Sequence, residues 1–204
     1  MSDHKTKHEH NSGIALLMTI MVLSVVVAVT LAIVELSLKQ LQLSVDTRDS
    51  EVAFHAANAG LECARYWRRV ASTSLEAPTG TGVPGGVMEC MSSVSSSSLL
   101  RTSASGDGLD VTGGTIGRFT KSMTWNLNRC SVIDMLVIVS GTTSSAVVTA
   151  EAGNLNQVFA NYPTASKTCP PGAKCTIVSA AGYNSSCANI NTAGTLKREV
   201  LLEF

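Results

Sequence analysis

The chain has 204 residues, with 15 basic and 15 acidic side chains and therefore no formal net charge. A length of this order suits one domain of ordinary size plus a membrane anchor. The balanced charge provides no basic surface of the kind that nucleic-acid-binding proteins use, so direct binding to nucleic acid is not expected. Aromatic residues make up 4% of the chain, which predicts a modest core in a loop-rich domain.

The first long pattern in the chain is an uncharged apolar segment over residues 14–34. Its 21 residues would form a helix about 30 Å long, the thickness of the hydrocarbon core of a bilayer. The apolar region of a secretory signal peptide is shorter, at about 7–15 residues. In lipid a single segment satisfies its own backbone only as a helix, because one strand cannot close a barrel. We therefore expect residues 14–34 to cross a membrane as a helix.

Helical periodicity continues over residues 35–69, where no proline occurs and the first glycine is Gly60. Apolar residues recur there at steps of three, four or seven, at Leu38, Leu41, Val45, Val52, Ala56, Ala59, Cys63 and Tyr66. This spacing predicts an amphipathic helix with one buried stripe. An unbroken helix of about 55 residues far exceeds the usual length in globular proteins, which favours packing into a bundle of identical or related helices. A juxtamembrane coiled coil has the same spacing and stays open as an alternative.

All six cysteines follow the apolar segment. An even number of cysteines on one side of a membrane span indicates disulfides in an oxidising compartment. We therefore expect the residues after 34 to lie outside the cytoplasm. The positive charges are shared almost evenly between the two flanks of the segment, so the positive-inside rule barely decides its orientation. A zinc site is the alternative, but no C-x2-C pair is present and no histidine follows His55.

The junction between the polar leader and the apolar segment reads Asn11-Ser12-Gly13 followed by Ile14-Ala15-Leu16-Leu17-Met18. This junction resembles the class III signal of type IV prepilins. In that family a prepilin peptidase cuts after the glycine, on the cytoplasmic side, and methylates the new N-terminus. The resemblance implies processing between Gly13 and Ile14, with residues 1–13 as the leader peptide that is removed.

Two departures from the family's pattern point to a particular group of pilin-like proteins. Most major pilins have a glutamate at the fifth mature position, where this chain has Met18, and a basic residue often precedes the glycine, where this chain has Ser12. Lack of that glutamate is characteristic of PilX-like minor pilins and GspK-like pseudopilins, which are thought to lie at or near the filament tip. The stretch Ala56-Ala57-Asn58-Ala59-Gly60-Leu61-Glu62 also resembles the A-A-E-A-G-hydrophobic-E stretch of PilX-like minor pilins, with Asn58 in place of the usual acidic residue.

Residues 70–204 are expected to form a loop-rich, β-sheet globular domain. Glycine, proline and serine dominate residues 70–115, which predicts a loop region. Strand-like patterns follow over residues 119–127, 134–140, 145–150, 176–181 and 196–204, and residues 141–143 suggest a hairpin between the second and third of them. The predicted fold class is α+β, with a long transmembrane-plus-amphipathic helix packed on a small antiparallel sheet around one hydrophobic core. This is the pilin-like ladle that the resemblance implies.

Disulfides are expected to stabilise a domain so poor in aromatic residues. The pairs that we expect are Cys63 with Cys90, Cys130 with Cys187, and Cys169 with Cys175. Cys63 lies on the predicted core stripe, and the last pair encloses a short turn that suits local closure. Six cysteines allow many other connectivities, so the pairing is a hypothesis.

The sequence contains no convincing catalytic, cofactor-binding or metal-binding pattern. His4, His8 and His10 lie in the leader. A Ser-His-Asp arrangement would therefore have to use His55, because it is the only histidine after the leader. The cluster Arg65, Arg68 and Arg69 reads as a cationic last turn that complements the helix dipole.

These patterns predict a non-enzymatic minor pilin or pseudopilin of a type IV pilus or a type II secretion-like filament, acting in assembly, adhesion or uptake. Its expected partners are the cytoplasmic membrane, prepilin peptidase and other pilin subunits. It would be a single-pass inner-membrane protein with the C-terminal domain outside, assembled into a surface filament. A permanently anchored extracytoplasmic binding domain is the alternative, and an anchored enzyme is a third possibility.

Overall fold

The structure is a computed structural model that describes residues 12–76, 90, 100–102, 108–125, 128–150, 154–159 and 162–204. The chain divides into two compact units, Met1–Thr47 and Arg48–Phe204. It combines one long N-terminal helix with antiparallel sheets, which confirms the predicted α+β class.

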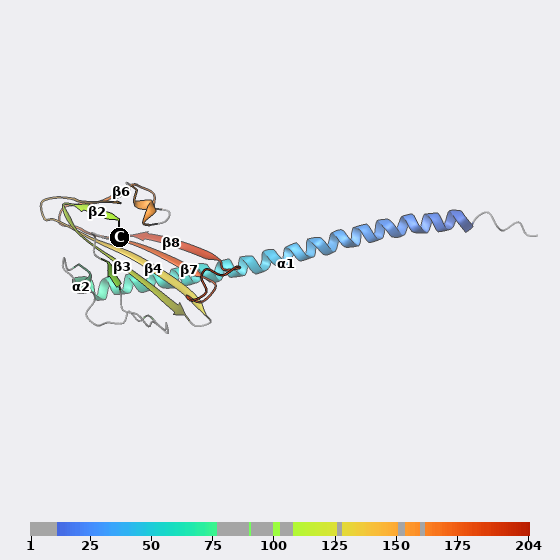
Figure 1. Cartoon of the computed structure of the whole chain (residues 1–204), viewed down its shortest axis with the longest axis horizontal. Helices are drawn as coiled ribbons and strands as arrows, with labels where there is room; N and C mark the ends of the chain where they lie inside the picture. The colour runs from blue at the N-terminus through green and yellow to red at the C-terminus, as the bar shows by residue number, and fades with distance from the viewer. Residues whose placement is uncertain are drawn as a thin grey trace, which may run out of the picture. The chain divides into compact units, whose positions relative to one another are not determined.

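Helix α1 spans Ser12–Val70, 59 residues in all, and is the long coiled ribbon in Figure 1. The absence of proline and the helical spacing of apolar residues had predicted a helix over nearly the same range. Ala71 separates α1 from the short helix α2, Ser72–Glu76. In α2 the side chain of Leu75 is buried, so the chain turns back onto the sheet directly after α1 ends.

The main sheet has five strands in the order β1-β3-β4-β7-β8, and all neighbouring strands are antiparallel. Their bounds are Leu100–Thr102 for β1, Gly114–Trp125 for β3, Arg129–Ser140 for β4, Lys174–Tyr183 for β7 and Lys197–Glu203 for β8. Figure 1 shows β3, β4, β7 and β8 side by side next to the C-terminal part of α1. The strands expected over 119–127, 134–140, 176–181 and 196–204 correspond to β3, β4, β7 and β8.

A second sheet has three strands in the order β2-β5-β6. Their bounds are Leu109–Thr112 for β2, Ala146–Ala150 for β5 and Ser166–Cys169 for β6, and a 3-10 helix η2, Leu155–Gln157, follows β5. The sequence pattern did not indicate β1, β2, β6 or α2. Helix α2 and strands β1 and β2 lie within residues 70–115, which were expected to be loop.

The hairpin expected at residues 141–143 is wrong. Strand β4 pairs with β3 and β7, whereas β5 pairs with β2 and β6. β2 and β3 follow each other along the chain, as do β4 and β5, and the two segments pair with each other. The ribbon that they form bends here, so that β3 and β4 lie in the main sheet and β2 and β5 lie in the second sheet. Gly113 has a φ of 76°, and a Cβ there would lie 2.2 Å from the Ser145 carbonyl oxygen. The amide of Gly141 donates to the Gly113 carbonyl at 2.9 Å, which fixes the bend.

The domain contains two hydrophobic cores rather than the single core expected, because both faces of the main sheet are covered. The helix-side core is centred on Leu61, Phe119, Met123, Met135 and Val178. The second core lies between the two sheets and contains Leu136, Ile138, Val148, Phe159 and Ile177, among others. Alternate residues of β4 enter opposite cores, since successive side chains of a strand point to opposite faces. This explains why β4 reads as a continuous apolar run.

The buried face of α1 matches the expected stripe at Ala56 and Cys63 but differs from it elsewhere. The buried residues are mostly small and include Ala53, Ala56, Ala57, Gly60, Leu61, Cys63 and Ala64. By contrast, four members of the predicted stripe are 56–63% exposed, namely Leu38, Leu41, Val45 and Tyr66. The periodicity recorded apolar character correctly, but it could not show which apolar residues the sheet covers.

Candidate functional site

Helix α1 carries a long, exposed apolar surface. Every large apolar side chain from Ile14 to Val45 is exposed, by 48–68%. The described part of the chain contains one helix that is long and apolar enough to cross a membrane. Together with the disulfides of the domain, this helix supports a single membrane span and an extracytoplasmic domain.

The three hydroxyl side chains within the apolar segment are satisfied by the helix itself. Thr19 donates to the Leu16 carbonyl and Ser24 to the Met21 carbonyl at 2.8 Å, and Thr30 donates to the Val27 carbonyl at 2.9 Å. An unpaired hydroxyl would be costly in lipid. These bonds therefore let the segment reside in a bilayer without a polar partner.

The expected processing site lies at the beginning of α1. Gly13 and Ile14 fall in its first turn, since the helix begins at Ser12. Ile14 and Met18 are 66% and 61% exposed. Peptidases bind extended chain, so cutting here would require the first turn to open, which helix ends do readily.

The junction of α1 with the main sheet explains why small residues fill the stretch that resembles minor pilins. A Cβ on Gly182 of β7 would lie 2.0 Å from the Ala53 carbonyl oxygen and 2.2 Å from the Ala57 amide nitrogen. A Cβ on Gly60 would lie 3.0 Å from the Ser131 Cβ. The helix backbone therefore rests directly on β4 and β7, and alanine and glycine are the residues that permit this approach.

A hydrogen-bonded serine fixes the register of this contact. Ser131 of β4 donates to the Ala56 carbonyl at 2.5 Å and accepts from the indole nitrogen of Trp125 at 2.6 Å. Ser131 is fully buried, so the bond to the helix backbone also removes the cost of burying its hydroxyl. Sequence patterns missed this residue, because the strand that they predicted begins at residue 134, whereas β4 begins at Arg129.

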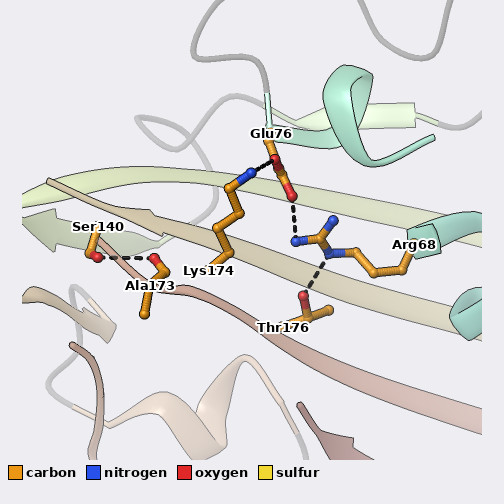
Figure 2. Close-up of polar contacts among 6 residues, drawn as sticks. All are labelled: Arg68, Glu76, Ser140, Ala173, Lys174 and Thr176. Atoms are coloured by element: carbon orange, nitrogen blue, oxygen red, sulfur yellow. Dashed lines mark hydrogen bonds and ion pairs between the residues drawn. The ribbon is translucent and has the colours of Figure 1, made fainter. Parts of the chain in front are cut away.

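A polar cluster holds the end of α1 and α2 against β7 (Figure 2). Arg68 pairs with Glu76 at 2.7 Å and donates through Nε to the Thr176 hydroxyl at 2.9 Å. Lys174 pairs with the other carboxylate oxygen of Glu76 at 2.5 Å. The sequence had suggested a helix-dipole role for Arg68, and the structure adds these specific partners, which the spacing of charges could not reveal.

Two cations control the ionisation of Glu76. Burial alone raises the pKa of this carboxyl, but hydrogen bonds from Lys174 and Arg68 outweigh burial and hold the pKa below its ordinary 4.5. A carboxyl with a lower pKa in the folded state stabilises the fold above its unfolded pKa. That stabilisation is lost as the pH falls through the folded value.

We expect Glu76→Gln to lower the free energy of unfolding at pH 7 by roughly 1–2 kcal/mol, because the Arg68 guanidinium loses its charged partner. The variant should also lose less stability than the wild type between pH 5 and about pH 3, since its residue 76 no longer titrates. Urea unfolding of the full chain in detergent at several pH values measures both effects. Glu62→Gln, which disrupts an exposed pair with Arg65, is the matched control and should change stability little. If the free energy of unfolding fell equally with pH in the wild type and in Glu76→Gln, the acid-sensitive stability would not come from Glu76.

The structure contains three disulfides, which are the pairs expected from the sequence. They join Cys63 to Cys90, Cys130 to Cys187, and Cys169 to Cys175, across sequence separations of 27, 57 and 6 residues. All six cysteines are therefore bonded. The first ties α1 to the segment at residue 90. The second ties β4 to the loop before β8, and the third joins β6 to β7 and so links the two sheets.

Other side chains singled out in the sequence occupy ordinary positions. His55 lies 3.6 Å from Glu51 on an exposed face of α1, and Arg65 pairs with Glu62 one helical turn away at 2.9 Å. Among the residues that the structure describes, no group of three or more His, Cys, Asp or Glu side chains is placed to hold a metal ion. His4, His8 and His10 lie outside the described residues.

No protein-family model, no curated protein and no solved structure matches the chain.

Proposed function

We propose that the chain is a non-enzymatic minor pilin or pseudopilin subunit, anchored in the inner membrane until its helix joins a filament of a type IV pilus or type II secretion-like system. One observation supports this proposal most strongly. The exposed apolar surface of α1 extends from Ile14 to Val45, and 32 helical residues measure about 48 Å. The hydrocarbon core of a bilayer covers about 30 Å.

A bilayer alone leaves the end of this surface in water. Tilting a helix of that length fully into the bilayer would need an angle of about 50°, beyond the usual limit of about 40°. Glu35 and Lys39 also favour an exit from lipid near residue 35. Five large side chains then remain in water: Leu36, Leu38, Leu41, Leu43 and Val45. Covering them by neighbouring helices would contribute roughly 1–2 kcal/mol each.

Processing at the leader tests this function. Co-expression of the full chain with a prepilin peptidase should yield a mature N-terminus at Ile14, detected by mass spectrometry of the intact protein. Gly13→Val should abolish this cleavage, because a branched side chain restricts the backbone at the bond to be cut. Ser12→Val, one position earlier, is the matched control and should still be processed.

An intact N-terminus in the presence of an active peptidase would contradict the proposal. That outcome would favour a permanently anchored extracytoplasmic domain instead. A mature chain that remains in the membrane fraction when the filament is sheared off would also oppose incorporation into a filament.

A further inference from the structure

Strand β8, Lys197–Glu203, forms one edge of the main sheet, since it stands last in the strand order, next to β7 (Figure 1). It pairs with β7 through all seven of its residues, with no bulge in the register, and it contains no proline. Among the edge strands that the structure describes it is the longest, because β1, β2 and β6 have three or four residues each. An edge of this kind presents a row of backbone groups with which another strand can pair.

The backbone groups of alternate residues in β8 face away from β7. Thr176 and Phe204 exchange two backbone hydrogen bonds, at 2.7 and 3.0 Å, and bonded pairs alternate with non-bonded pairs along an antiparallel ladder. The residues of β8 whose amide and carbonyl groups point outward are therefore Lys197, Glu199, Leu201 and Glu203. Within the described part of the chain, no backbone hydrogen bond from another segment reaches these groups. They are available to an added strand.

The centre of this edge is apolar and only partly covered. Val200 and Leu202 pack onto the helix-side core, and Leu201 packs onto the second core on the opposite face of the sheet. All three side chains are only partly buried, because an edge strand has a neighbour on one side alone. A strand added beside β8 would extend both cores, and side-chain pairs across neighbouring strands are what stabilises a sheet.

Charged residues at the ends of β8 determine which charges suit the added strand. Lys197 and Glu203 lie at the two ends, and their side chains are 48% and 34% exposed. Each has a partner on the same chain, Glu199 and Lys167 respectively, yet both remain open to a further charge. Opposite charges directly across a ladder stabilise it, and like charges destabilise it. A fitting segment therefore carries an acidic residue opposite Lys197 and a basic residue opposite Glu203.

A second membrane-anchored copy does not fit this edge. The part of α1 within the domain runs in the same direction as β8. Arg198, near the start of β8, donates to the Ser50 hydroxyl at 2.8 Å. At the other end, Arg68 donates to Thr176, which pairs with Phe204. In an antiparallel pair of β8 strands the two α1 helices would run in opposite directions, so one membrane would not anchor both. An in-register parallel pair would place like charges opposite each other.

We propose that the outer edge of β8 binds an extended segment of another protein by β-strand addition, with that segment antiparallel to β8. Antiparallel pairing is slightly more stable per residue than parallel pairing. The segment supplies apolar residues opposite Val200, Leu201 and Leu202, with an acidic residue at one end and a basic residue at the other. Backbone hydrogen bonds provide the affinity, and the side chains provide the specificity. This inference goes beyond the proposed function and does not rest on it, since it needs only the domain and its membrane anchor.

Binding of synthetic peptides to the full chain in detergent tests this edge. The matched probe is Lys-Arg-Glu-Val-Leu-Leu-Glu, capped at both ends and carrying a fluorescent label. Without an anchor this peptide is free to align antiparallel to β8, which places its lysine opposite Glu203 and its last glutamate opposite Lys197. The charge-exchanged probe is Glu-Glu-Lys-Val-Leu-Leu-Lys, and the blocked probe is the matched peptide with N-methyl groups on the alternate amides that face β8. By fluorescence anisotropy, the matched probe should bind several-fold more tightly than either of the others.

Variants of the chain separate strand pairing from non-specific binding. Leu201→Pro removes one outward amide, at a type of edge position where proline is tolerated, and should abolish binding of the matched probe. Leu201→Ala keeps that amide and is the matched control, which should bind nearly as well as the wild type. Lys197→Glu should weaken binding of the matched probe and strengthen binding of the charge-exchanged probe, several-fold in each case, because it reverses the charge at one end of the edge.

Several outcomes would overturn the proposal. Equal binding of the matched and blocked probes would show that the contact does not use backbone hydrogen bonds. Undiminished binding to Leu201→Pro would place the peptide elsewhere on the chain, and a lack of saturable binding by the wild type would show that the edge accepts no strand. If Leu201→Pro proves to be unfolded, Lys197→Glu decides the matter, since an unchanged preference for the matched probe would exclude β8 as the site.

Discussion

Gly182→Val is expected to destabilise the domain by about 3 kcal/mol or more, at the upper end of the range for overpacked sites. Even the first carbon of the new side chain would lie 2.0 Å from the Ala53 carbonyl oxygen and 2.2 Å from the Ala57 amide nitrogen. Both atoms belong to the backbone of α1, which cannot turn aside as a flexible side chain does. The helix would have to move away from β7, and the buried bond between Ser131 and the Ala56 carbonyl would be lost with it.

Urea unfolding of the full chain in detergent measures this effect. Gly194→Ala is the control, because a Cβ there meets no atom within 4 Å, although its φ of 84° makes alanine costly by about 1–2 kcal/mol. Gly182→Ala should fall closer to Gly182→Val than to this control. A loss at Gly182→Ala no larger than at Gly194→Ala would show that the helix does not rest on β7 as closely as the structure places it.

The second large effect is expected from Cys130 and Cys187. Their disulfide spans 57 residues, and removing it should lower the free energy of unfolding by about 4 kcal/mol in the chain-entropy description of disulfides. Cys130 is fully buried, so alanine is the better replacement, because a buried serine would need a new hydrogen-bond partner. The double variant Cys130→Ala/Cys187→Ala should unfold at clearly lower urea concentration than the wild type.

The pair Cys169→Ala/Cys175→Ala is the matched control for this experiment. This double variant removes the same atoms as the first one, and it too replaces one fully buried cysteine, Cys169. The two cysteines are only 6 residues apart in the sequence. The chain-entropy description gives about 2.4 kcal/mol for such a short loop. If the short-loop variant were the less stable of the two, loop entropy would not govern these bonds, and the link between the two sheets would be the more important contribution.

The long helix was predictable because its signal is local. In a bilayer an uncharged run of 21 residues satisfies its own backbone only as a helix, and the lack of proline through residue 69 lets that helix continue. The strands β3, β4, β7 and β8 were likewise indicated by β-branched and alternating patterns. The three cysteine pairs in the structure are the expected ones. The core stripe had supported a partner for Cys63 and the short turn had supported Cys169 with Cys175, whereas no local pattern singled out Cys130 with Cys187.

The errors arose where distant segments decide the outcome. Residues 134–140 and 145–150 read as a hairpin, but one edge of β4 pairs with β3, which directly precedes it, and the other edge pairs with the distant strand β7. The short strands β1, β2 and β6 carry too few residues to show a period of their own. The cluster of Arg68, Glu76 and Lys174 joins positions up to 106 residues apart, a distance over which charge spacing carries no information.

The amino-acid sequence by itself determined that this chain has a long helix with a membrane-spanning part and a cysteine-bearing domain behind it. Only the tertiary structure decided which residues of that helix the sheet covers. The sheet covers small residues of α1 between Ala53 and Ala64. The physical reason is steric: a helix can approach a sheet closely only where its side chains and those of the strands, such as Gly182, are small enough to let the two backbones meet.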